Sequence, residues 1–407
     1  MKNTKVRNES GQVSIITVIA FILLFSVLVI SFSRIMVAAS RQAVNDELAA
    51  SAKAAADAGI EDAKRILSYC AAGGGADCDM LDKPLEDSDC TTISSKNSLM
   101  NALQRQVVSG SSVKVGNGVN QEEYLCLKMT MSTPDFLESL SSDGNSDGRH
   151  ESIVIPLKFV DRNNVPTMAR TIRIQWHNTS SGSSGSASPL NGSDLPPTDK
   201  WDGTAPAVVR AEFVAVPAGS FRFDQLAENM RAVTLRPSTA ENAFGAPKVV
   251  GNAFNLDYWS WAGASEPRSD SDTKFPLMQI RCNGSDGYAC SVEFTIPRTP
   301  GGGGTDYLFD TNQYNYYLRL QAVYQNTNVR VSAKDGSGRN LYFSKVQAAV
   351  DVTGRAGESL KRLATRLNPV SPDPDDEWWP DYAVDSAGKI CKRMTIKDVD
   401  GTDYCDD

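Results

Sequence analysis

The chain has 407 residues and a formal net charge of -8, with 41 Lys and Arg against 49 Asp and Glu. This acidic composition lacks the excess of Lys and Arg that is typical of nucleic-acid-binding proteins, so nucleic acid is not an expected partner. At about 150 residues per domain, the length leaves room for roughly two globular units.

The first predicted element is a membrane-spanning helix. Residues 13–33, VSIITVIAFILLFSVLVISFS, carry no charge and are mostly apolar, and about 20 such residues cross the hydrocarbon core of a bilayer as a helix. Lys2, Lys5 and Arg7 precede the run, and the positive-inside bias predicts that this end stays cytoplasmic. The rest of the chain is then expected to be the extracytoplasmic head of a single-pass membrane protein at the cell surface.

Three interpretations of this segment compete. A cleaved secretory signal has an apolar core of only about 7–15 residues, although Val37-Ala38-Ala39 would suit its cleavage site. The second interpretation is a plain single-span anchor. The third follows from the junction of Gly11 and Gln12, where a short charged leader ends in Gly just before the apolar run. This junction resembles a type IV prepilin leader, and the resemblance implies that a prepilin peptidase cuts after Gly11 and leaves Gln12 as the mature N-terminus.

Residues 38–67 are expected to continue the membrane helix. They contain no Pro, one Gly and many Ala, the best helix former. Together with the apolar run they predict one helix of about 55 residues, or roughly 80 Å. An anchor alone does not need this extension, whereas in a pilin the second half of the helix lies on a globular head. Residues 54–61, AAADAGIE, also resemble a stretch of minor pilins and pseudopilins. Apolar residues recur at helical spacing, at Val44, Leu48, Ala52, Ala55 or Ala56, Ile60 and Leu67.

One residue departs from the resemblance. Most major pilins carry Glu at the fifth position of the mature chain, where it pairs with the N-terminal amine of a neighbouring subunit. Counted from Gln12, that position is Ile16, which cannot neutralise a charge in an apolar environment. The resemblance therefore implies a minor pilin or tip pseudopilin, whose partners are the bilayer, other pilin subunits, the pilus assembly platform and prepilin peptidase.

All eight cysteines lie beyond the predicted membrane segment. An even number on the outward side suggests disulfides formed in an oxidising compartment, with buried free thiols as the alternative. No CxxC motif supports a zinc site. Proximity favours Cys282 with Cys290 and Cys391 with Cys405, and the second pair resembles the loop closed near the end of many pilin heads. The other four are expected to pair among themselves: Cys70, Cys78, Cys90 and Cys126.

Strand signals dominate after about residue 120. The turn at 161–164 lies between two apolar runs and predicts a hairpin. Residues 360–367 are ambiguous between a strand and a helix. Runs rich in β-branched and aromatic residues predict strands at 124–129, 152–160, 169–176, 207–216, 277–282, 289–296, 316–324, 329–333 and 340–352.

Residues 178–200, NTSSGSSGSASPLNGSDLPPTDK, form a low-complexity stretch. Because structureless loops above about 15 residues are uncommon in compact domains, an interdomain linker is favoured over a long loop within one sheet. The predicted fold class is α+β, with a pilin-like long N-terminal helix followed by a β-rich, disulfide-containing head. The predicted organisation is a leader at 1–11, a helix at 12–68, a first α+β head region at 69–177, the linker, and a β-rich domain at 201–407.

A search for catalytic motifs finds no HExxH, no GxSxG and no P-loop. The two histidines, His150 and His177, are expected to be surface side chains. No enzymatic activity and no cofactor are therefore predicted.

Two acidic loops raise a calcium hypothesis, because they offer carboxylate and amide oxygens at alternating positions beside Gly. Both ligand sets are incomplete, so solvated turns are the default interpretation. The candidate ligands are Asp143, Asn145, Asp147 and Glu151 in the first loop, and Asp398, Asp400 and Asp403 in the second.

Aromatic clusters are the candidate binding residues of the head. Exposed Trp and Tyr rings would contact a sugar or a protein partner at low entropic cost, whereas burial in the core of the head is the alternative. The clusters contain Tyr258, Trp259, Trp261, Trp378 and Trp379.

The expected function is that of a structural or assembly subunit of a type IV pilus or a related secretion-system pseudopilus. It would be a minor or tip pilin whose exposed head serves adhesion or partner binding. The alternative is a single-pass membrane-anchored extracellular binding protein, an adhesin or receptor, that never enters a filament; an anchored hydrolase is third. Cleavage after Gly11 distinguishes the first two, because only a prepilin is cut there.

Overall fold

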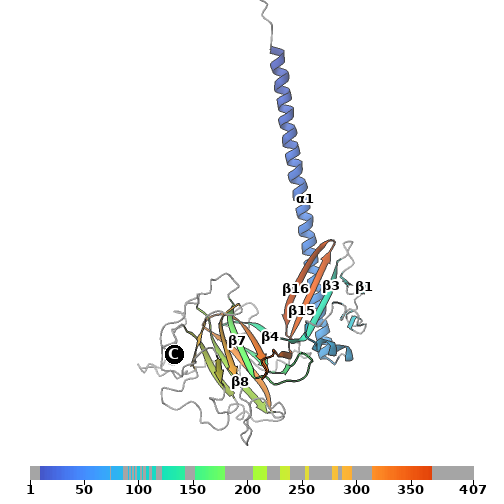
Figure 1. Cartoon of the computed structure of the whole chain (residues 1–407). Coiled ribbons are helices and arrows are strands. Elements are labelled where there is room, and N and C mark those ends of the chain that lie inside the picture. Colours follow the sequence, from blue (N-terminus) through green and yellow to red (C-terminus); the bar gives the residue numbers. More distant parts are fainter. Residues whose placement is uncertain are drawn as a thin grey trace, which may run out of the picture. The chain divides into compact units, whose positions relative to one another are not determined.

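The chain forms two compact units in this computed structural model (Figure 1). Unit 1 comprises Met1–Thr130 with Ala348–Val370, and unit 2 comprises Met131–Gln347 with Ser371–Asp407. The chain enters unit 2 within β3 (Glu123–Thr133) and returns within β15 (Tyr342–Ala356). The structure describes residues 10–73, 75–85, 90, 93, 96, 99–100, 103, 107–109, 112–115, 122–142, 152–178, 205–217, 230–238, 253–255, 277–282, 287–295 and 314–368.

This division differs from the boundary that the sequence predicted at 178–200. β5 (Ser152–Pro156), before that stretch, pairs with β13 (Tyr314–Val323) after it. β7 (Thr171–Asn178) likewise pairs with β14 (Thr327–Lys334). Strands from both sides of the stretch therefore share the sheets of unit 2, and the predicted head regions are not separate bodies. Composition shows how polar a segment is, but not where its flanking strands pair.

One unbroken helix, α1 (Ser10–Ala71, 62 residues), begins unit 1. It is about 90 Å long and joins the apolar run to the Ala-rich stretch, as predicted (Figure 1). Gly73, just past its end, has φ 89°, and the amide of Gly73 donates to the carbonyl of Cys70 at 3.2 Å. A glycine at positive φ is a usual helix terminator, because it lacks the Cβ that makes this conformation costly. The helix is followed by the 3-10 helix η1 (Ala76–Asp82).

The C-terminal part of α1 runs alongside a sheet of strand order β1-β2-β3-β15-β16 (Figure 1). Small residues make this close contact possible. A Cβ added to Gly354 of β15 would lie 2.1 Å from the carbonyl oxygen of Ala52 and 2.5 Å from the amide nitrogen of Ala56, and one added to Gly59 would lie 2.6 Å from Cγ1 of Val352. The remaining strands are β1 (Val107–Ser109), β2 (Ser112–Lys114) and β16 (Ser359–Leu367).

The buried stripe of α1 differs in part from the predicted one. Val44 is 51% exposed and Ile60 is half-buried, whereas Asp62 is fully buried. Its Oδ2 accepts a hydrogen bond from the hydroxyl of Tyr124 at 3.1 Å. A count of apolar spacings overlooks such a residue, because a carboxylate on the packed face is tolerated only when tertiary partners satisfy it.

Unit 2 contains two five-stranded sheets, with orders β10-β12-β7-β14-β4 and β11-β9-β8-β13-β5. Their inner faces share one apolar core, in which the rings of Phe213 on β8 and Phe294 on β12 lie 5.1 Å apart, centroid to centroid. Trp176 of β7 is fully buried and its indole N–H donates to the carbonyl of Ala207 at 2.9 Å. The other strands are β4 (Asp135–Leu140), β8 (Val208–Pro217), β9 (Met230–Ser238), β10 (Ala253–Asn255), β11 (Leu277–Arg281) and β12 (Tyr288–Thr295).

The predicted hairpin around 161–164 is confirmed only next to the turn, where Val160 forms an antiparallel bridge with Pro166. Oδ1 of Asp161 accepts hydrogen bonds from the amides of Asn163 and Val165 at 2.8 and 2.9 Å. The strand before the turn, β6 (Phe159–Val160), pairs with β15, and β5 and β7 belong to different sheets. Beyond this short hairpin, the connection crosses from one sheet of unit 2 to the other, so β5 and β7 do not pair as predicted.

Candidate functional site

The N-terminal half of α1 is the candidate site, because it leaves a continuous apolar surface open. Its large apolar side chains from Val18 to Val37 are between 52% and 66% exposed. The most apolar window of the helix has a mean hydropathy of 2.5, and none of it is buried. Contiguous exposed apolar patches above a few hundred Å² are rare on soluble monomers. This helix is long and apolar enough to cross a membrane.

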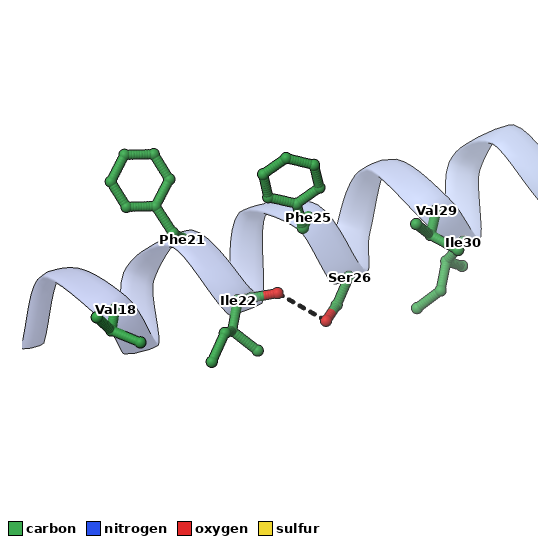
Figure 2. A pocket seen from close by; sticks show the side chains of 7 residues that line it. All are labelled: Val18, Phe21, Ile22, Phe25, Ser26, Val29 and Ile30. Carbon is green, nitrogen blue, oxygen red and sulfur yellow. Dashed lines mark hydrogen bonds between the residues drawn. The ribbon is translucent and has the colours of Figure 1, made fainter. Parts of the chain in front are cut away.

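A shallow groove follows this segment (Figure 2). Phe21 and Phe25, four residues apart, stand on the same side of the helix, and Ile22 and Ser26 lie away from them (Figure 2). Because one helix supplies the whole lining, the groove does not enclose a small molecule, but it suits acyl chains or a second helix. Its lining residues are Val18, Phe21, Ile22, Phe25, Ser26, Val29 and Ile30.

The polar group within this groove is satisfied inside the helix. The hydroxyl of Ser26 donates to the carbonyl of Ile22 at 2.7 Å (Figure 2). A bilayer core offers no water, so hydroxyls there need such internal partners. No Asp, Glu, Lys or Arg occurs at 13–33, and Arg34 is the first charge after the run. The segment is thus compatible with hydrocarbon along its length.

The predicted processing residues lie at the start of this helix. Gly11 and Gln12 are in the first turn of α1, and the structure describes only their backbone. Cleavage between them stays a prediction.

The part of the chain that the structure describes contains three disulfides: Cys70–Cys78, Cys90–Cys126 and Cys282–Cys290. The first four cysteines pair among themselves as predicted, and the third bridge is one of the two pairs that proximity favoured. Cys70–Cys78 fastens the last turn of α1 to η1, and Cys282–Cys290 joins the end of β11 in one sheet of unit 2 to β12 in the other. Cys391 and Cys405 lie outside the described residues.

The predicted calcium loops and aromatic clusters also lie outside the described residues, so both hypotheses stay predictions. Within the described ranges, no three His, Cys, Asp or Glu side chains converge on a point that would hold a metal ion. The residues concerned are Asp143, Asn145, Asp147, Glu151, Asp398, Asp400 and Asp403, and Tyr258, Trp259, Trp261, Trp378 and Trp379.

Charged residues of unit 2 form ion pairs both within a strand and across neighbouring strands. Glu212 of β8 pairs with Arg210 of the same strand at 2.7 Å and with Arg319 of the neighbouring strand β13 at 3.3 Å. Cross-strand pairs such as Glu212–Arg319 stabilise strand register. His177, expected at the surface, is half-buried, and burial lowers the pKa of its imidazole. Its backbone amide donates to the hydroxyl of Thr327 at 3.0 Å. These contacts stabilise the pairing of the strands in unit 2. None of them places a nucleophilic side chain beside a general base.

Comparison with known proteins identifies no relative: no family model, no curated protein and no solved structure matches the chain. A functional argument must therefore start from the physical chemistry of α1 and its surroundings.

Sequence reasoning did not single out the contacts that fasten α1 to its sheet. Gly354 lies in a strand and Gly59 in a helix, and both approach the facing backbone or side chain closely. A glycine inside a strand or helix is a signal for such an approach. Only the structure shows which two elements meet there.

Proposed function

We propose that the chain is a minor or tip subunit of a type IV pilus or a related secretion-system pseudopilus. Before assembly, α1 holds it in the membrane with the N-terminus cytoplasmic and the head outside, where the head serves adhesion or partner binding. The observation that carries this proposal is the two-part helix, whose first half is apolar and exposed and whose second half is packed on the sheet of unit 1. A plain anchor needs only about 20 residues, whereas α1 has 62.

The middle of α1 supports association with other subunits. Residues 34–47 are exposed on all sides and form a neck about 20 Å long between the apolar run and the packed half. Met36 and Val44 in this neck are 60% and 51% exposed. Most of the stability of helices in proteins comes from tertiary packing, and this neck has none within its own chain. Neighbouring helices in a filament would supply that packing.

The charge pattern supports a tip position over a place in the bulk of the filament. The chain has Ile16 at the fifth position after Gly11, and no Asp or Glu occurs at 12–45. No carboxylate of this half is available for the N-terminal amine of a subunit buried beside it, and an unpaired charge in an apolar environment is strongly disfavoured. A subunit at the tip needs no such pairing with a subunit above it.

Mass spectrometry of the mature chain tests the proposal. The wild type should begin at Gln12, and Gly11→Val should remain full length because the peptidase site is blocked. Ser10→Ala, one residue away, is the matched control and should be cut normally. A mature chain beginning near Ser40, or a wild type that keeps its first 11 residues, would contradict processing as a prepilin.

Immunogold labelling of sheared filaments tests the position. Sparse label at filament ends supports a tip subunit, and uniform label along the length rejects it. A processed protein absent from all filaments would instead favour the membrane-anchored binding protein.

A further inference from the structure

Two arginines follow the apolar run on one face of α1. Arg34 and Arg41 are seven residues apart, which is two helical turns or about 10 Å. Both side chains are exposed. They line a second shallow groove with Val29, Ile30, Ser33, Val37 and Ala38. The lining of the helix surface therefore changes from mostly apolar in the first groove to cationic in the second, where the apolar run ends.

The surroundings of these arginines contain no nearby counter-charge. In the part of the chain that the structure describes, neither guanidinium has an ion pair or a side-chain hydrogen bond. The basic residues of the packed half differ, since Lys64 pairs with Glu61 at 2.7 Å and Arg65 lies 3.9 Å from Asp62. The sequence has no Asp or Glu between Arg34 and residue 45. Two unpaired positive charges thus stand at the level where a bilayer surface would lie.

We propose that Arg34 and Arg41 bind the phosphate groups of anionic phospholipids at the C-terminal end of the membrane span. A guanidinium matches phosphate oxygens with two parallel hydrogen bonds, and anionic headgroups attract basic residues close to a membrane span. Ile30 and Val37 in the same groove provide apolar contact for the start of the acyl chains. The proposal rests on the membrane-anchoring part of the proposed function and not on assembly into a filament.

A second copy of the chain fits this face less well. Two parallel helices in register would place Arg34 beside Arg34 and Arg41 beside Arg41, and like charges side by side are unfavourable. Only a copy shifted along the helix axis would bring Asp46 and Glu47 to Arg41. Phospholipid headgroups satisfy both arginines without such a shift.

The experiment uses the full-length protein in vesicles of phosphatidylcholine and phosphatidylglycerol, with either lipid spin-labelled in turn. The fraction of motionally restricted label measures which lipid contacts the helix. The wild type should prefer phosphatidylglycerol at low salt, by up to about fivefold for each arginine, and the preference should weaken as salt is raised. Arg34→Gln with Arg41→Gln should abolish it, and Arg34→Lys with Arg41→Lys should restore most of it because the charges return. The matched control, Lys53→Gln with Lys361→Gln, removes two exposed cations beside the packed half and should leave the preference unchanged.

Four outcomes would overturn the proposal. The first is equal restriction of the two lipids by the wild type, and the second is a preference that survives Arg34→Gln with Arg41→Gln. In the third, free glycerol phosphate displaces the labelled phosphatidylglycerol, which would indicate a site for a soluble anion. In the fourth, cross-linked dimers form in pure phosphatidylcholine and disappear with the two glutamine substitutions, which would assign the arginines to a second copy.

An uncut Gly11 or an absence from filaments would contradict the filament proposal while leaving the lipid preference intact.

Discussion

At Gly354 the backbone of a strand touches the backbone of a helix. A Cβ there would meet the carbonyl oxygen of Ala52 and the amide nitrogen of Ala56. Backbone atoms cannot rotate aside as a side chain can, so Gly354→Ala should force α1 away from the sheet. We expect the free energy of unfolding of unit 1 to fall by about 1–3 kcal/mol, as for other overpacked cores. Chemical denaturation in detergent, followed by hydrogen exchange of the buried amides of α1, measures the loss.

The control for Gly354→Ala is Ala364→Val on the neighbouring strand β16. Ala364 is exposed, so its added methyl groups meet open space and should change stability by no more than about 0.5 kcal/mol. Equal losses in the two variants would show that the helix and sheet are not in close contact.

Asp335 ties together the turn that follows β14. Its Oδ1 accepts from the hydroxyl of Ser337 at 2.7 Å and from the amides of Ser337 and Arg339 at 2.8 and 2.9 Å. These hydrogen bonds, with that of the Ser337 hydroxyl contributing most, hold the pKa of the carboxyl well below its usual range. Because the folded pKa is depressed, the stabilisation is complete above the unfolded value near 4 and is lost as pH falls through the folded value.

An NMR titration of the Asp335 carboxyl checks this expectation. Its midpoint should lie well below that of exposed aspartates, and Asp335→Asn should remove the corresponding acid-dependent loss of turn structure. Ser337→Ala should raise the midpoint towards the ordinary value, since it removes the largest contribution. A wild-type midpoint near 4 would contradict the hydrogen-bond pattern.

Among the elements, β4 at the edge of its sheet shows how unpaired strand groups are satisfied. On one side β4 pairs with β14. On the other, the side-chain amide of Gln347 accepts from the amide of Leu137 at 3.1 Å and donates to the carbonyl of Leu137 at 2.8 Å. Gln347 is 1% exposed, so it occupies the place of a further strand. Covered edges of this kind protect a sheet from pairing with another chain.

Comparing two disulfides separates the stability that comes from closing a loop from the stability that comes from packing in the core. Cys70–Cys78 and Cys282–Cys290 both have a sequence separation of 8, so the chain-entropy contribution is the same, about 2.5 kcal/mol. Cys290 is fully buried in the core of unit 2, whereas Cys70 is half-buried. Replacing Cys282 and Cys290 by Ala should therefore cost more than replacing Cys70 and Cys78, because it also leaves a cavity.

Hydrogen exchange of β7 reports the first pair of substitutions, and exchange of the last turns of α1 reports the second. Losses of equal size in the two units would show that Cys290 contributes only loop closure.

At the scale of the whole molecule, most of the large exposed apolar side chains among the described residues lie in the N-terminal half of α1. Removing residues 1–43 deletes the large exposed apolar residues of α1 except Val44 and retains the packed face that begins near Leu48. We expect the shortened protein to remain in solution without detergent, while the full chain requires detergent for extraction. Sedimentation after membrane lysis measures this difference, and circular dichroism checks that the shortened protein is folded. A shortened protein that still pellets with membranes would indicate a second anchoring surface.

Local patterns in the sequence predicted much of the fold. The helix from the apolar run to residue 67 is confirmed, because helical periodicity and Ala content are properties of neighbouring residues. The strands at 207–216, 289–296 and 329–333 are likewise found close to their predicted positions. The apolar half of α1, which forms the candidate site, was also predicted from the sequence, since the length and apolar character that suit a membrane span depend only on an uninterrupted run of apolar residues.

Pairing between distant segments was decided only by the tertiary structure. Residues 360–367 were ambiguous until β16 paired with β15, with Leu367 opposite Ala348. The extension of the hairpin at 161–164 into its flanking strands and the boundary at 178–200 were mispredicted, because β5 and β7 find partners more than a hundred residues away, in β13 and β14. By itself the sequence determined which segments are helical, extended or apolar, because those preferences act over a few neighbouring residues. Their partners, the boundary between units and the close contact at Gly354 depend on which surfaces exclude water together, and that is settled only when the whole chain packs.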